Sequence, residues 1–185
     1  ALGLVRAAAA VDAVLLPGTP GGDLGGVLAR LDKLFEDVDP AELAAIALTV
    51  AVEAGELITV ERPRDLGVAE TKSSRTDVVT VMDQRSQDHL LARLGQLRPD
   101  DGFAGEERGG RVGTSGITWV VDPIDGTKNF VRGVPVWATL IALLDQGEPV
   151  VGVVSAPALG RRWWAARGSG AYTGKSLAQA TRLEV

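Results

Sequence analysis

Two aspartates three positions apart end an apolar run near the middle of the chain. The run is Trp119-Val120-Val121, and Asp122-Pro123-Ile124-Asp125-Gly126-Thr127 follows it directly. Carboxylate and carbonyl oxygens are the ligands that Mg²⁺ prefers, so Asp122, Asp125 and the intervening carbonyls suit a hard cation. Gly126 and Thr127 add backbone N–H groups and a hydroxyl, which suit a bound phosphate. Asp, Pro and Gly also favour turns, so this segment alone is equally consistent with an ordinary turn.

The composition restricts the kinds of metal site and partner. The chain has 185 residues, no cysteine and a single histidine, His89, to which we assign no chemistry. Cysteine-based metal sites and disulfides are therefore excluded, and any metal must be held by oxygen. A formal net charge of -5 disfavours nucleic-acid binding, which needs a basic surface. Residues 1–16 are too short and too interrupted by charge for a membrane span or a clear signal peptide. We expect a cytoplasmic protein with no nucleic-acid or membrane partner.

The hydrophobic pattern predicts two helices followed by strands. Asp39-Pro40 is typical of a helix start, and apolar residues at helical spacing extend this helix to about Val60. Residues 76–82 have the β-branched character of a strand, and a second helix is predicted from about Asp83 to the break at residues 98–102. Its predicted buried side consists of Leu90, Leu91, Leu94 and Leu97.

Four apolar runs then predict consecutive strands, at residues 117–121, 136–144, 149–156 and 162–166. Two helices followed by such strands predict an α+β fold with a largely antiparallel sheet. Residues 1–38, which include a Gly/Pro-rich linker at residues 17–26, are predicted to be an extension of unknown role. We expect the α+β domain to occupy residues 39–185.

Three acidic segments occur in an order and spacing that resemble the inositol monophosphatase superfamily. They are Lys72-Ser73-Ser74 through Asp83, then Gly105-Glu106-Glu107, then the segment from Asp122 to Thr127. The order of several independent motifs is far more specific than any one of them. The resemblance covers about residues 40–185. It implies the N-terminal half of the layered αβαβα sugar-phosphatase fold, because no Trp-Asp motif typical of the family's second half occurs before Val185.

The resemblance also implies hydrolysis of a small phosphorylated metabolite with Mg²⁺. In that case Glu106, Asp122 and the carbonyl of Ile124 hold one ion, while Asp122 and Asp125 hold a second. Glu106 and Thr127 are expected to orient the attacking water, with the Thr127 proton passing toward the carboxylate. The segment Ile124, Asp125, Gly126 and Thr127 is expected to receive the phosphate through its N–H groups.

Several of these residues also have ordinary structural explanations. Lys72 and Asp83 are predicted to be catalytic, but Lys72 could be an exposed lysine and Asp83 could simply cap its helix. Glu106 and Glu107 could form a solvated acidic corner. We expect Glu106 to be a ligand and Glu107 to support it from behind.

The indications of substrate change along the chain. Residues 66–127 look like bacterial inositol-1-phosphatases, whereas the sequence from Lys128 onward looks more like the histidinol-phosphate phosphatases of the same superfamily. We expect a phosphoric monoester hydrolase for one of these two substrates, with an apolar sheet face that favours a homodimer. Two alternatives stay open: a non-catalytic family member that binds a partner, and a fragment of a longer phosphatase that is inactive or weak alone.

Overall fold

The described residues form two long helices, a small hairpin and an eight-stranded sheet. The computed structural model describes residues 39–61, 68–71, 78–107 and 109–184, so the predicted extension at residues 1–38 and the candidate Lys72 lie outside the described residues. In chain order the elements are α3 Pro40–Glu61, β1 Val68–Thr71, β2 Val78–Thr80, α4 Val81–Leu97, β3 Gly102–Gly105, β4 Gly110–Arg111, β5 Ile117–Asp125, α5 Thr127–Arg132, β6 Ala138–Asp145, β7 Glu148–Ala156, β8 Arg161–Ala166, β9 Gly170–Gly174 and β10 Thr181–Arg182.

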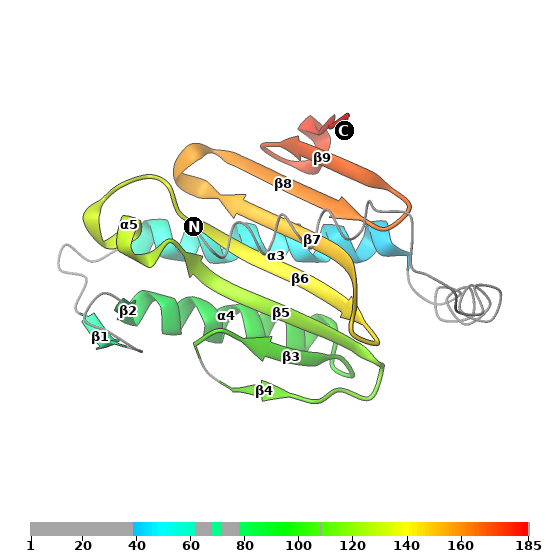
Figure 1. Ribbon diagram of the computed structural model, residues 1–185, viewed down its shortest axis with the longest axis horizontal. Helices are drawn as coiled ribbons and strands as arrows, with labels where there is room; N and C mark the ends of the chain where they lie inside the picture. Colours follow the sequence, from blue (N-terminus) through cyan, green and yellow to red (C-terminus); the bar gives the residue numbers. More distant parts are fainter. Residues whose placement is uncertain (1–38, 62–67, 72–77, 108, 185) are drawn as a thin grey trace, which may run out of the picture.

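The large sheet has the order β10-β9-β8-β7-β6-β5-β3-β4. Every neighbouring pair is antiparallel except β3 and β5, which run parallel. From β5 to β9 the strands follow one another in sequence across the sheet, as Figure 1 shows. The β6–β7 turn places Gln146 and Gly147 at positive φ, as a tight hairpin turn requires. The predicted α+β fold with a largely antiparallel sheet is confirmed.

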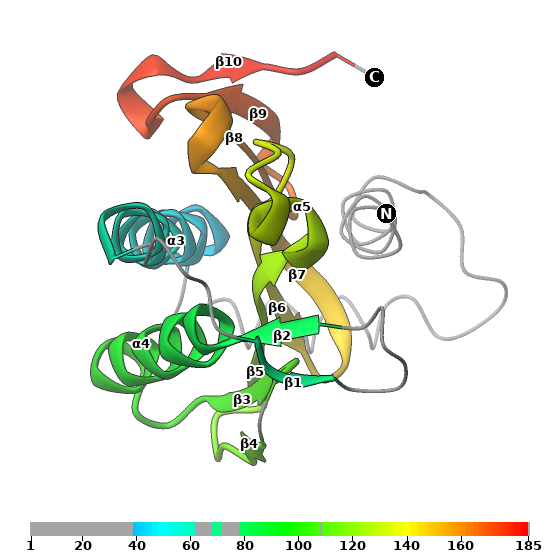
Figure 2. The same cartoon turned by 90° about the vertical axis from the view of Figure 1, so that its left-hand side faces the viewer.

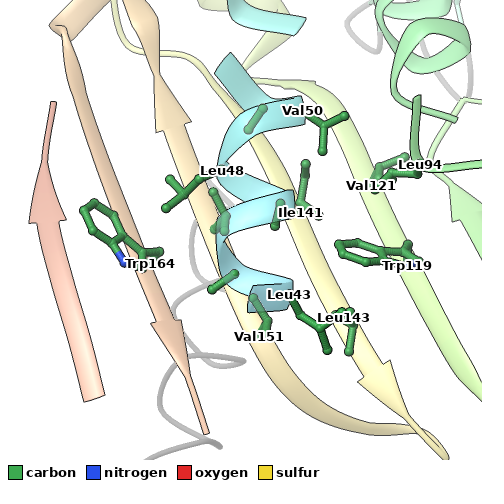
Figure 3. Packing of buried hydrophobic residues seen from close by; sticks show 14 of the residues in the cluster. Leu43, Leu48, Val50, Leu94, Trp119, Val121, Ile141, Leu143, Val151 and Trp164 are labelled. Atoms are coloured by element: carbon green, nitrogen blue, oxygen red, sulfur yellow. The ribbon is translucent and has the colours of Figure 1, made fainter. Parts of the chain in front are cut away.

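Both long helices pack on the same face of this sheet (Figure 2). Alternation along the strands aims Trp119, Val121 and Ile141 at the helices, where they are nearly inaccessible to solvent. Figure 3 shows Leu43 of α3 beside Leu143 and Val151, and Leu94 of α4 beside Val121. By length and composition alone α3 could cross a membrane, but half of its apolar window is buried, and it is a core helix of this domain.

Three predictions about these elements need correction. The predicted strand at residues 76–82 ends at Thr80, because the Thr80 hydroxyl accepts from the N–H groups of Met82 and Asp83 and starts α4 at Val81. Leu97, predicted to be buried, is 43% exposed at the last turn of α4. The acidic segment does not follow its strand as a separate turn, because β5 continues through Asp125 with a register shift between Asp122 and Asp125.

Candidate active site

The parallel pairing of β3 with β5 brings Glu106 beside Asp122. Gly105 pairs with Val121, and the Glu106 N–H donates to the Val121 carbonyl at 3.0 Å. Glu106 and Asp122 are therefore the next residues along two adjacent parallel strands. The Glu106 side chain contacts the carboxyl of Asp122 by a hydrogen bond. The Glu106 and Asp122 motifs, which the Gly-rich segment separates in sequence, thus meet at the carboxyl ends of β3 and β5.

Burial, together with the crowding of acidic groups, raises the pKa values at the carboxyl ends of β3 and β5. Burial raises the pKa of Asp122 to about 9, with further contributions from Glu106, Asp125 and Asp83 in that order. Burial also raises the pKa of Asp125, and the charge of Glu106 acts in the same direction. Desolvation and like charges both disfavour the ionised carboxylates. A cation placed among them would reverse this effect.

The free oxygens of these carboxylates fit a bound cation. Within the described part of the chain, Asp122 Oδ1 and Asp125 Oδ2 are buried and have no hydrogen-bond partner. Buried polar atoms normally have partners, so two such oxygens in one motif call for an explanation. No three His, Asp and Glu side chains among the described residues converge into a complete metal cluster. The donors that fit a cation are the carboxylates of Asp122 and Asp125, with the carboxylate of Glu106 beside Asp122. The Ile124 carbonyl and water would complete the set, since Mg²⁺ commonly keeps several waters.

Asp83 joins the helix cap to the acidic motif. Its side chain is 1% exposed, and its Oδ2 accepts from the Thr80 N–H at 2.8 Å and from the Thr80 hydroxyl. Its Oδ1 lies 3.1 Å from the Thr127 hydroxyl oxygen, which is also 2.9 Å from the Ile124 carbonyl oxygen. Burial raises the pKa of Asp83, and the hydrogen bonds from Thr80 and Thr127 oppose this shift. Asp83 therefore both caps α4 and contacts a predicted catalytic residue.

Gly126 gives the chain the sharp turn that places Thr127. It has a φ of 88°, and a Cβ there would lie 3.0 Å from the carbonyl oxygen of Val136. Left-handed backbone and close contact both favour glycine at this position. The turn ends β5 and starts α5. It brings the Thr127 hydroxyl back to the Ile124 carbonyl. The expected role of Ile124, Asp125, Gly126 and Thr127 in phosphate binding stays a prediction.

The sequence interpretation missed two contacts that support the candidate site. Thr80 and Asp83 form a capping box, and the spacing Thr-x-x-Asp is a signal that could have located this helix start. The Thr139 hydroxyl donates to the Pro123 carbonyl at 2.9 Å and supports the irregular end of β5. No local pattern links Thr139 to Pro123, because the contact depends on the pairing of β5 with β6.

Comparison with known proteins gives this arrangement a family. The model of the inositol monophosphatase family matches residues 39–184. The chain belongs to this family. A histidinol-phosphatase of Mycobacterium tuberculosis is 54% identical over 141 residues, covering 76% of this chain and 54% of the relative. An inositol-1-monophosphatase of Mycobacterium leprae is 41% identical over 150 residues, covering 74% of this chain and 52% of the relative.

Solved structures of the inositol monophosphatase family have the same fold. The SuhB protein of Bartonella henselae superposes with a TM-score of 0.68 at 30% identity, over 76% of this chain and 53% of the SuhB chain. The chain thus spans about half the length of the relatives it matches. The predicted family and fold are confirmed. The assignment of Glu106, Asp122, Ile124 and Asp125 as metal ligands, and of Glu106, Thr127 and Asp83 as catalytic groups, stays a prediction.

Proposed function

We propose that the protein containing this chain is a Mg²⁺-dependent phosphatase of small phosphate monoesters. The observation that carries the proposal is the pair of buried, unpartnered oxygens on Asp122 and Asp125, beside Glu106. Histidinol phosphate is the favoured substrate over inositol 1-phosphate, because 54% identity to a histidinol-phosphatase exceeds 41% identity to an inositol-1-monophosphatase. A cytoplasmic location and dimerisation belong to the same proposal.

The acidic residues at the ends of β3 and β5 suit the binding of Mg²⁺ and phosphate together. Asp122, Asp125, Glu106 and the Ile124 carbonyl would hold the metal. Bound Mg²⁺ would supply Lewis acidity, which lowers the pKa of a water and neutralises phosphate charge. The three carboxylates repel a phosphate unless a cation lies between them and the ester, so substrate affinity should depend on the metal.

The Asp83–Thr127 pair suits proton transfer from the attacking water. The Thr127 Oγ1 accepts a proton from the water while its own proton moves to Asp83 Oδ1, 3.1 Å away. The water oxygen forms the new bond to phosphorus, the ester P–O bond breaks, and the leaving oxygen takes a proton from solvent. Burial raises the pKa of Asp83, which makes its carboxylate a stronger base. In this proposal the proton from Thr127 ends on Asp83. The expected orientation of the water by Glu106 and Thr127 stays a prediction.

Phosphate release with matched substrates tests the proposal. Histidinol phosphate and inositol 1-phosphate are assayed with Mg²⁺ and with excess chelator. The expected result is release that requires Mg²⁺ and is faster with histidinol phosphate. Full release in chelator would contradict the metal mechanism, and faster release from inositol 1-phosphate would reverse the order of substrates.

A further inference from the structure

The side chain of Gln87 lies against the turn that carries Glu106. Gln87 belongs to α4 and is completely buried. Its Oε1 accepts a hydrogen bond of 2.8 Å from the backbone N–H of Glu107. A Cβ on Gly105 would lie 2.4 Å from the Gln87 amide, so the backbone of Gly105 packs directly on this side chain. The amide of Gln87 therefore contacts the chain on both sides of Glu106.

We propose that Gln87 is a positioning residue that holds Glu106 for metal binding. This inference rests on the proposed function, because it assumes that Glu106 is a ligand. Glu106 is itself exposed, and its carboxyl faces that of Asp122. Because Glu106 is exposed, a turn that nothing held in place would let its side chain move away from Asp122 toward solvent. Fixing the backbone at Gly105 and Glu107 reduces that freedom.

Helix α4 gives the contact a rigid base. Asp83 and Gln87 are four residues apart, so both project from one face of the helix. Asp83 contacts Thr127, and Gln87 contacts Glu107, so one helix holds both the predicted proton acceptor and the turn of a predicted ligand. The helix is fixed in turn by Leu90 and Leu94, which are completely buried in the core. The spacing between these two parts of the site is therefore set by a packed helix.

Loss of the contact between Gln87 and the Glu106 turn should lower Mg²⁺ affinity more than it lowers the stability of the fold. Groups that hold a metal ligand in place typically change metal affinity by about 10–100-fold when they are removed. A hydrogen bond of purely structural value lowers stability without changing metal affinity in the folded protein. The two roles are therefore separable by measuring both quantities.

A calorimetric titration of the whole chain with Mg²⁺ alone tests the proposal. Gln87→Met keeps the length of the side chain but removes the acceptor oxygen. Gly105→Ala pushes the same amide away from the other side. Ser115→Ala is the matched control, because it removes a hydrogen bond of 2.7 Å to the buried Asp101 near the opposite end of β3. Thermal unfolding in chelator measures the stability of each variant.

The expected result is that Gln87→Met and Gly105→Ala each weaken Mg²⁺ binding by about tenfold or more, whereas Ser115→Ala lowers stability alone. The double variant of Gln87→Met and Gly105→Ala should weaken binding by less than the sum of the two single effects, because both substitutions remove the same contact. If the unchanged chain and Gln87→Met bind Mg²⁺ equally, the role of Gln87 is overturned and the proposed function stands. If the unchanged chain binds no Mg²⁺, both are overturned. If Gln87→Met fails to fold, the Mg²⁺ affinity of Gly105→Ala is compared with that of the unchanged chain instead, and equal affinities overturn the role of Gln87.

Discussion

The carboxylate of Asp83 divides its two oxygens between a helix cap and a hydroxyl of the candidate site. Oδ2 accepts from Thr80, and Oδ1 lies beside Thr127. A cap alone is typically worth about 1 kcal/mol, so changing Asp83 would alter folding and chemistry together. Thr127 is the better residue to test, because its hydroxyl belongs to the site and caps no helix.

Thr127→Ala should lower the rate of phosphate release while leaving Mg²⁺ affinity unchanged. The expected loss is about 10²–10⁴-fold, as for removal of a positioned proton-transfer group. Thr127→Ser keeps the hydroxyl and is expected to retain most of the rate. The measurements are turnover of histidinol phosphate and calorimetric titration with Mg²⁺. If Mg²⁺ affinity fell as much as the rate, Thr127 would have a structural role instead.

At the scale of single residues, the sequence indicated the acids better than their partners. Asp122, Asp125 and Glu106 follow apolar or strand-like runs, so their types and positions pointed to one site. The contact between Asp83 and Thr127 spans 44 residues and depends on the packing of α4 against the end of β5. No local pattern contains that information. The expected orientation of a water by Thr127 and Glu106 stays a prediction.

At the scale of elements, an ion pair joins α3 to α4. Arg93 donates to the two carboxylate oxygens of Glu53 at 2.7 and 3.0 Å, and His89 lies 3.5 Å away. The hydrogen bond from Arg93 is the main cause that lowers the pKa of Glu53 below its ordinary value of 4.5. A carboxyl whose pKa is lower in the folded state stabilises the fold above its unfolded pKa. This contribution is lost as the pH falls through the folded pKa.

Arg93→Gln should therefore destabilise the fold at pH 7 and have little effect in acid, where Glu53 is protonated. Both side chains are about one-third exposed, so the loss should not exceed about 1 kcal/mol. Urea unfolding at pH 7 and at an acid pH below the folded pKa of Glu53 measures the difference. The control is Arg85→Gln, which breaks a more exposed pair with Glu61 and should cost less. An equal loss at both pH values would show that Arg93 acts through packing.

The prediction of elements succeeded where the apolar pattern is long. The predicted helix from Asp39-Pro40 to about Val60 corresponds to α3, and the four predicted strands correspond to β5, β6, β7 and β8. The short strands β4 and β10 have only two residues each, too few for any periodicity. The parallel pairing of β3 with β5 crosses a Gly-rich segment, and a sequence pattern does not specify such a neighbour. This pairing is nevertheless the one that assembles Glu106 and Asp122.

At the scale of the whole molecule, the sheet is covered by helices on one face only, within the described residues (Figure 2). Val120 lies between Trp119 and Val121, which face the helices, so it points to the opposite side and is 37% exposed. The same alternation places Leu140, Val154 and Trp163 on that face, where Leu140 is buried and Val154 and Trp163 are partly buried. Exposed apolar patches of a few hundred Å² commonly mark interaction surfaces.

We expect the chain to form dimers or larger species through this face. Val120→Glu should shift the population toward monomer, because a charge at the contact would lose its hydration. Val112→Glu is the control: Val112 is 96% exposed and lies outside the sheet strands. Sedimentation velocity over a range of concentrations measures the change. If both variants associate like the unchanged chain, the contact lies elsewhere.

Calorimetric titration of the chain with Mg²⁺ measures whether Asp122 and its neighbours hold the ion. Asp122→Asn removes the carboxylate at the centre of the acidic cluster. Asp145→Asn is the matched control, since Asp145 is also buried with an unpartnered oxygen but lies at the opposite end of the β5–β6 pair. We predict loose binding at one site in the unchanged chain and in Asp145→Asn, and no measurable binding in Asp122→Asn. Equal binding by Asp122→Asn, or no binding by the unchanged chain, would show that Asp122 does not hold Mg²⁺ in this site.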